Sequence, residues 1–258
     1  GRPASIRTYV GHPFVIRVAQ PKGPQPEITL AASCESTEAR QKFIFRKEVI
    51  GGWAVHLECP IEYTHNLMST IVNELTSDLE HINSLLPEQI LTRLQTTQLF
   101  VVASKEAKPS VQMKGGGGAL FMNPLGDMAS QDAPEAYSGS IVINANAWIN
   151  TRRWQPAGAT LHEIAHAWHC MNWPCFSNDS LITEAYEAAI STGIYDQVER
   201  NSGNTEKAYA ASNKQEYFAE LTEAWFWEND YYPYNREELL EHDPLGAAAV
   251  EAAWNVVP

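Results

Sequence analysis

The sequence TLHEIAHAWH (residues 160–169) determines how the rest of the chain is interpreted. It contains an H-E-x-x-H motif in which His162 and His166 are four residues apart. Positions four apart lie on one face of an α-helix, so both imidazoles can bind a single metal ion. Glu163 then stands beside the open coordination position, where its carboxylate can take a proton from water.

The residues around the motif favour a helix. Leu161, Ile164, Ala165 and Trp168 recur at helical spacing and predict a buried stripe. A proline at position 156 suits the first turn, and another at position 174 ends the run. Because short motifs also arise by chance, the alternative is a helix that carries two ordinary histidines.

The composition limits the class of protein. With 258 residues, 44% of them hydrophobic, the chain can form one good-sized core or one domain with an appendage. Its 18 basic and 31 acidic residues give a net charge of −13, which argues against nucleic acid or an anionic membrane as partner. No apolar run is long enough to span a bilayer. The start, without Met or a signal-peptide pattern, is typical of a processed protein.

The four cysteines and a glycosylation motif indicate the compartment. Cys170 and Cys175 flank a short turn that a local disulfide could close, and Cys34 and Cys59 remain as a second pair. Three connectivities are possible, and Cys170 could instead bind the metal. A sequon occupies residues 178–180. Together these features favour a secreted, extracellular protein.

The N-terminal part is predicted to be β-rich. Runs of Ile, Val and Phe alternate with Gly and Pro turns and predict strands at residues 5–10, 14–18, 27–31, 41–46 and 53–57. This pattern predicts a β-rich segment over residues 1–57 and a second domain over residues 58–258.

The run IRTYVGHPFVIR (residues 6–17) resembles later strands of the von Hippel–Lindau tumour-suppressor β-domain, where a Tyr-x-Gly-His-x-aromatic motif occurs. The resemblance implies that the chain enters a β-sandwich partway. The unpaired strand edge would then require an upstream fragment, a second copy or another partner chain. The alternative is a small β-appendage of no special kinship.

Beyond residue 60 the pattern is typical of an α+β domain whose helices back a sheet. Apolar residues every three to four positions predict a long helix from Leu67 to Leu86, and a second helix is expected from Pro87 to Leu94. Strands are predicted at Leu99–Ala103 and Ser140–Ala145, the latter followed by the metal helix. Gly118–Met122 is the expected sheet edge, on which an extended peptide could pair.

Two acidic sites compete to supply a third metal ligand. Glu184 and Glu187, on a helix predicted over Leu181–Val198, follow His166 by 18 and 21 residues. Glu216 follows it by 50 and also has the spacing of a capping box with Asn213. A ligand must lie on a helix packed against the metal helix. The apolar face within residues 206–230 indicates a helix there, and two further helices are expected at residues 236–241 and 245–256.

The motif HEIAHAWH followed by AYAASNKQEYFAE resembles the anthrax lethal factor family of zinc peptidases, which includes secreted Pro-Pro endopeptidases. The resemblance covers residues 140–230 and implies a zincin-like fold. It also implies that Zn²⁺ is bound by His162, His166 and Glu216. Glu163 would then be the general base, and Tyr209 would stabilise the oxyanion or donate a proton.

Two neighbouring residues have supporting roles in this interpretation. The metzincin pattern needs a histidine six residues after His166, where this chain has Asn172, so His169 is expected in the second shell or at the surface. Glu220 could orient a ligand histidine or lie on a solvated helix face. The sequence therefore predicts a secreted α+β zinc metalloendopeptidase that acts on a peptide or protein substrate. The alternatives are an idle peptidase-like binding module and a zinc enzyme acting on another amide.

Overall fold

The computed structural model describes residues 28–29, 45–58, 65–103, 118–124, 137–152, 158–173 and 176–255. Within these ranges the chain is a mixed α+β structure, as the sequence predicts. The strands expected at residues 5–10 and 14–18, and the run 6–17 that carries the von Hippel–Lindau resemblance, lie outside the described residues.

A six-stranded sheet forms one half of the molecule, in the order β1-β2-β3-β4-β6-β5. Gly51 and Gly52 turn the β2–β3 hairpin with φ values of 56° and 91°, a conformation that glycine adopts without steric cost. Strands β3, β4 and β6 are parallel, whereas β5 pairs antiparallel with β6 at the edge. The strands are β1 (Ile28–Thr29), β2 (Phe45–Ile50), β3 (Trp53–Glu58), β4 (Leu99–Val102), β5 (Ala119–Phe121) and β6 (Ile141–Asn144).

The sheet crosses the domain boundary that the sequence predicts between residues 57 and 58. β3 pairs in parallel with β4, and Val55 and Leu57 pack in the same core as Val101. Residues 45–58 are therefore part of the main sheet rather than of a separate N-terminal segment. A periodicity of two identifies a strand but does not say which sheet the strand joins.

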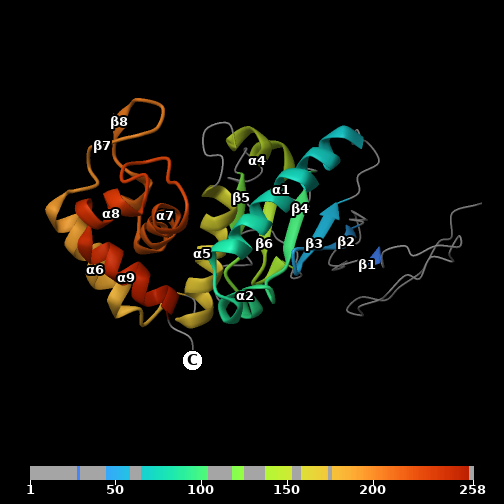
Figure 1. The fold of residues 1–258 in the computed structure, drawn as a ribbon, viewed down its shortest axis with the longest axis horizontal. Helices are drawn as coiled ribbons and strands as arrows, with labels where there is room; N and C mark the ends of the chain where they lie inside the picture. Colours follow the sequence, from blue (N-terminus) through green and yellow to red (C-terminus); the bar gives the residue numbers. More distant parts are fainter. Residues whose placement is uncertain are drawn as a thin grey trace, which may run out of the picture.

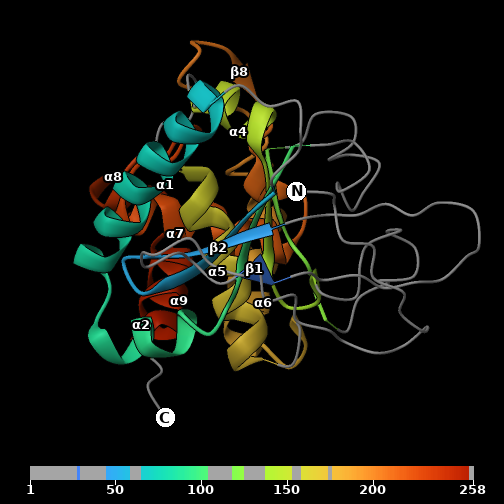
Figure 2. The ribbon, with the colours of Figure 1, turned by 90° about the vertical axis from the view of Figure 1, so that its right-hand side faces the viewer.

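Alternation along the strands gives the sheet two packed faces. Leu99 and Val101 of β4 face the core that contains the helices, while Phe100 and Val102 face a smaller cluster with Phe45. Helix α1 (His65–Leu85) buries its apolar stripe in the first core, and α2 (Glu88–Leu94) follows it directly. Figure 2 shows α1 and α2 together on one side of the strands.

Helix α5 (Gly158–Asn172), which carries the motif, lies between the sheet and the C-terminal helices (Figure 1). Leu161, Ile164, Ala165 and Trp168 are fully buried, so the predicted stripe is confirmed. The other half of the molecule contains α6 (Ser180–Thr192), α7 (Lys214–Phe226), α8 (Arg236–His242) and α9 (Pro244–Asn255). Because α5 packs on both halves, its motif lies where they meet.

The helices predicted before α5 and at the C-terminus are confirmed, with three differences in between. The helix indicated within residues 206–230 begins only at Lys214 and ends at Phe226. The short helix α4 (Ala145–Thr151) follows β6 directly and was not predicted. The helix predicted to Val198 ends at Thr192, because Gly193 adopts a left-handed conformation with φ of 69°. The chain then forms a hairpin of β7 (Val198–Glu199) and β8 (Thr205–Glu206), followed by the 3₁₀ helix η4 (Tyr209–Ala211).

Two further expectations can be compared with the described residues. β5 occupies residues 119–121 at the end of the sheet, which confirms the predicted edge strand. Among the described helices, none is both long and apolar enough to cross a bilayer.

Candidate metal centre

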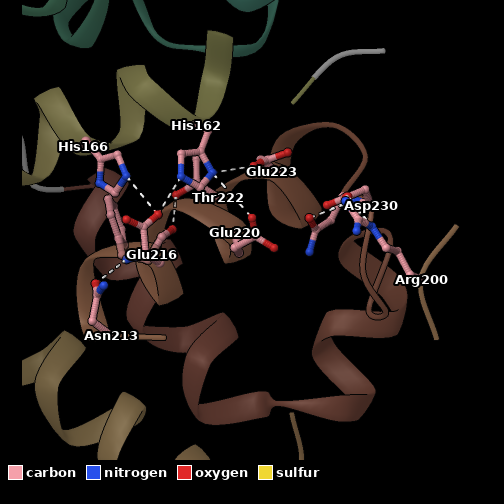
Figure 3. Close-up of polar contacts among 11 residues, drawn as sticks. His162, His166, Arg200, Asn213, Glu216, Glu220, Thr222, Glu223 and Asp230 are labelled. Atoms are coloured by element: carbon pink, nitrogen blue, oxygen red, sulfur yellow. Dashed lines mark hydrogen bonds and ion pairs between the residues drawn. The ribbon is translucent and has the colours of Figure 1, made fainter. Parts of the chain in front are cut away.

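The centre forms where α5 meets the first turn of α7. Asn213 caps α7, and its Oδ1 accepts hydrogen bonds from the backbone N–H groups of Gln215 and Glu216, both at 3.0 Å. Only one half of the capping box is therefore formed, the one in which the Asn213 side chain accepts from the backbone. The Glu216 carboxylate is directed toward the two histidines of α5 instead (Figure 3).

The three expected ligands converge. Oε2 of Glu216 lies 2.9 Å from Nε2 of His162 and 3.3 Å from Nε2 of His166. The potential ligand atoms of the three residues all lie within 4.8 Å of one another. Atoms bound at about 2.0–2.2 Å around a tetrahedral zinc ion are about 3.3–3.6 Å apart. The spacing therefore fits one small tetrahedral ion.

The competing acidic site does not approach the histidines. Glu184 and Glu187 are exposed on α6, and neither belongs to a potential metal-binding group within the described residues. The structure therefore favours Glu216 over Glu184 and Glu187 as the third ligand. Cys170 lies on α5 outside these groups as well. Cys34, Cys59 and Cys175 lie outside the described residues, so the disulfide connectivity stays a prediction.

A carboxylate holds the far side of His162. Nδ1 of His162 lies 2.7 Å from Oε1 of Glu223 and 3.6 Å from Oε1 of Glu220. A partner there fixes the ring orientation and the tautomer that leaves Nε2 free for a metal. Glu220 was expected to do this, but Glu223 has the shorter contact. The signal for Glu223 was its position two helical turns after Glu216.

Glu220 lies next to this pair but is not on a solvated face. It is 2% exposed, and its Oε2 has no hydrogen-bond partner among the described residues. Burial, together with the neighbouring charge of Glu223, raises the pKa of Glu220 well above its ordinary value. For Glu216 burial also raises the pKa, but hydrogen bonds with His162 and His166 outweigh it and hold the pKa well below the usual range. Glu216 is therefore ionised, as a metal ligand must be.

Glu163 connects α5 to the edge strand. Its Oε2 accepts a hydrogen bond of 2.6 Å from the backbone N–H of Phe121 in β5. The side chain is buried, and burial raises the pKa of the carboxyl above its ordinary value. A carboxylate with a raised pKa is a better proton acceptor, so the environment suits a general base.

Tyr209, in η4, stands at the mouth of the centre. Its ring lies 6.2 Å from the ring of His162, centroid to centroid, and the residue is 43% exposed. Burial of the phenol raises the pKa of Tyr209 to about 12. The hydroxyl is therefore protonated at neutral pH and can donate a hydrogen bond toward the cavity.

His169 does not lie at the surface, which excludes one of the two places expected for it. It is fully buried rather than at the surface, and its Nε2 lies 2.7 Å from Oδ2 of Asp179. Its ring packs edge-on against Phe176, which also packs against His166. His169 is thus connected to the ligands through packing rather than through a direct hydrogen bond.

These residues line an open cavity of about 620 Å³. Both halves of the molecule contribute to its walls. The sheet half contributes uncharged residues, Asn123 among them, and the C-terminal half contributes most of the charged side chains. The lining includes Gly118, Leu120, Phe121, Thr151, His162, Glu163, His166, Phe176, Arg200, Tyr209, Glu216, Glu220, Asp230 and Tyr231.

Comparisons with protein-family models, with curated proteins and with solved structures found no match to this chain.

Proposed function

We propose that this chain is a zincin-like zinc metalloendopeptidase of the gluzincin type, with His162, His166 and Glu216 as ligands. The observation that carries the proposal is the convergence of two imidazole Nε2 atoms on the Glu216 carboxylate, at 2.9 and 3.3 Å, in the wall of an open cavity. Two histidines and a carboxylate are a frequent ligand set of catalytic zinc, in which a fourth position stays open.

The chemistry divides between the ion and the chain. When bound, Zn²⁺ would supply Lewis acidity and lower the pKa of water toward neutrality. The Glu163 carboxylate would take the proton from the attacking water and later deliver it to the leaving amine. The Tyr209 hydroxyl, protonated at neutral pH, would donate a hydrogen bond to the developing oxyanion.

A peptide or protein substrate suits the cavity best. The edge strand β5 lines it, and its outer side has no neighbouring strand among the described residues. An extended peptide could add to this edge through main-chain hydrogen bonds, which recognise shape rather than sequence. Glu163 accepts a hydrogen bond from Phe121 of the same strand, so β5 would hold both the general base and the substrate in place.

Turnover of a quenched peptide library, measured with zinc content, tests the proposal. Glu163→Gln should keep zinc and lose activity by about 10²- to 10⁴-fold, the usual contribution of general-base catalysis. Tyr209→Phe should also keep zinc and slow turnover less. Wild-type cleavage rates in Glu163→Gln contradict the mechanism. A zinc-loaded wild type that cleaves no peptide supports the idle binding module or a zinc enzyme acting on another amide.

Secretion is part of the same proposal. Asn178, the sequon asparagine, is exposed in the turn before α6 and therefore accessible to glycosylation. Expression through a eukaryotic secretory pathway should give a product whose mobility shifts on glycosidase treatment. An unglycosylated Asn178 in secreted material would remove this support.

A partner at the N-terminal segment is likewise proposed. β1 is the outermost strand of the described sheet at the end opposite β5, so its outer side has no strand neighbour among the described residues. Such an edge is commonly covered by another strand or chain. A strictly monomeric mass in solution would contradict a second copy or another chain at this edge.

A further inference from the structure

A buried carboxylate joins three helices beside the centre. Asp179, the N-cap residue of α6, is 2% exposed. Its Oδ2 lies 2.7 Å from Nε2 of His169 on α5. Its Oδ1 accepts hydrogen bonds from Nζ of Lys214 on α7 at 2.5 Å and from Oγ1 of Thr183 at 2.8 Å. One side chain therefore connects α5, α6 and α7.

Lys214 occupies an unusual place for a cation. It is the first residue of α7, where the positive end of the helix dipole disfavours a positive charge. Its ammonium instead forms an ion pair with the Asp179 carboxylate and lies 3.2 Å from Oγ1 of Thr183. This contact with the N-cap residue of α6 offsets the unfavourable position and joins the first turn of α7 to α6.

The junction stands next to ligands on both helices. His169 follows His166 by three residues, and Lys214 precedes Glu216 by two. The two histidine ligands share α5, so the helix alone fixes their spacing. Glu216 comes from α7, so its distance from the histidines depends on how α7 sits against α5.

We infer that Asp179 and Lys214 are positioning residues that set Glu216 against the two histidines. The inference rests on the proposed zinc site and assigns it a supporting network outside the metal-binding motif. Loss of the ion pair should let the first turn of α7 shift and weaken metal binding, while Glu216 itself is unchanged.

A second buried aspartate offers a matched control. Asp78 on α1 is 1% exposed, and its Oδ2 accepts hydrogen bonds from Arg152 at 2.5 Å and Thr160 at 2.8 Å. This junction connects α5 to α1 and to the end of α4, and its hydrogen bonds do not involve α7. A change there should lower stability without changing how α5 and α7 meet.

The experiment compares Lys214→Met, Asp179→Asn and Asp78→Asn in the full chain. Zinc affinity is measured by competition with a chelator, the cobalt(II)-loaded protein by its visible absorption spectrum, and stability by thermal unfolding. Lys214→Met and Asp179→Asn should bind zinc about 10- to 100-fold more weakly, the usual effect of losing a partner that supports the ligands. Their cobalt spectra should change, and Lys214→Arg should recover most of the affinity. Asp78→Asn should unfold at lower temperature with zinc affinity within about twofold of wild type.

Unchanged zinc affinity in Lys214→Met, or an equal loss in Asp78→Asn, overturns the inference. Lys214 is 24% exposed, so its substitution gives a result even if Asp179→Asn does not fold. A wild-type chain that binds no zinc refutes the proposed function and this inference with it. A wild type that binds zinc with equal affinity in all variants refutes the inference alone.

Discussion

The two sides of the cavity contribute different things. The sheet side, from β5 and α4, presents uncharged residues such as Leu120, Phe121 and Thr151. The C-terminal side presents Glu216, Glu220, Asp230 and Arg200, and α5 lies between the two sides. One side therefore has the means to recognise an extended backbone, and the other holds most of the charged groups.

This difference has a consequence for mutations. Changes on the helical side alter charged groups and the proposed metal ligands in a buried environment, where unpaired groups are costly. Changes on the sheet side alter shape only. We therefore expect metal binding to respond to α7 and its neighbours, and substrate affinity to respond to β5.

The largest expected effect on metal binding is at Glu216. Glu216→Ala removes one of the three proposed ligands, so zinc should be lost on dialysis against a mild chelator, and the proposed peptidase activity with it. The affinity loss should exceed the roughly 10- to 100-fold typical of residues that only support a ligand. Glu187→Ala, at an exposed position of α6, is the matched control and should keep zinc. The reverse result would move the site to α6.

A smaller effect separates the two carboxylates behind His162. Glu223→Gln removes the carboxylate at 2.7 Å from Nδ1 and should weaken zinc binding by about 10- to 100-fold. Glu220→Gln changes a group at 3.6 Å and should have a weaker effect, because Glu223 still orients the ring. Zinc competition on both variants measures the difference. A greater loss of zinc affinity in Glu220→Gln than in Glu223→Gln would mean that Glu220 orients His162.

Much of the sheet side could be predicted from the sequence. The apolar periodicity of α1 and the short apolar run of β4 are local patterns, and both elements formed where predicted. The pair His162 and His166 is also local, since helical spacing alone places both on one face. Even the edge strand β5 could be located, because glycines precede it and a strand pattern follows.

The helical side needed information that a local pattern does not contain. Helix α7 is buried almost throughout, so periodicity does not show whether Glu220 or Glu223 faces His162. In the sequence Asp179 is only the middle residue of a sequon, and its contacts with His169 and Lys214 depend on the fold. The short helix α4 was missed because Asn144 ends β6 and also caps the helix, which leaves no loop between them.

The pH dependence of stability offers a third test of the helical side. Burial raises the pKa of Asp179, but hydrogen bonds from His169, Lys214 and Thr183 outweigh it and lower the pKa from 3.8 to about 2. The ionised carboxylate therefore stabilises the fold above pH 4, and this contribution is lost as the pH falls toward 2. The difference between these two pKa values corresponds to about 2 kcal/mol of folding free energy. In metal-free protein, the stability difference between wild type and Asp179→Asn should shrink by this amount between pH 5 and pH 2, measured by urea unfolding. A constant difference would mean that Asp179 is not held as an anion.

The smallest expected effect is on the sheet side, at Gly118. A Cβ added there would lie 3.1 Å from Oγ1 of Thr151 and 3.6 Å from Cα of Trp148, so Thr151 must move by a few tenths of an ångström. Gly118→Ala also adds a methyl group to the cavity wall beside the edge where a peptide would pair. KM for a cleaved peptide should rise by about threefold, or ~0.6 kcal/mol, with kcat and zinc affinity unchanged. Steady-state kinetics with zinc competition would show this split. A loss of zinc in Gly118→Ala would contradict the division between the two sides, because no metal ligand comes from β5 or α4.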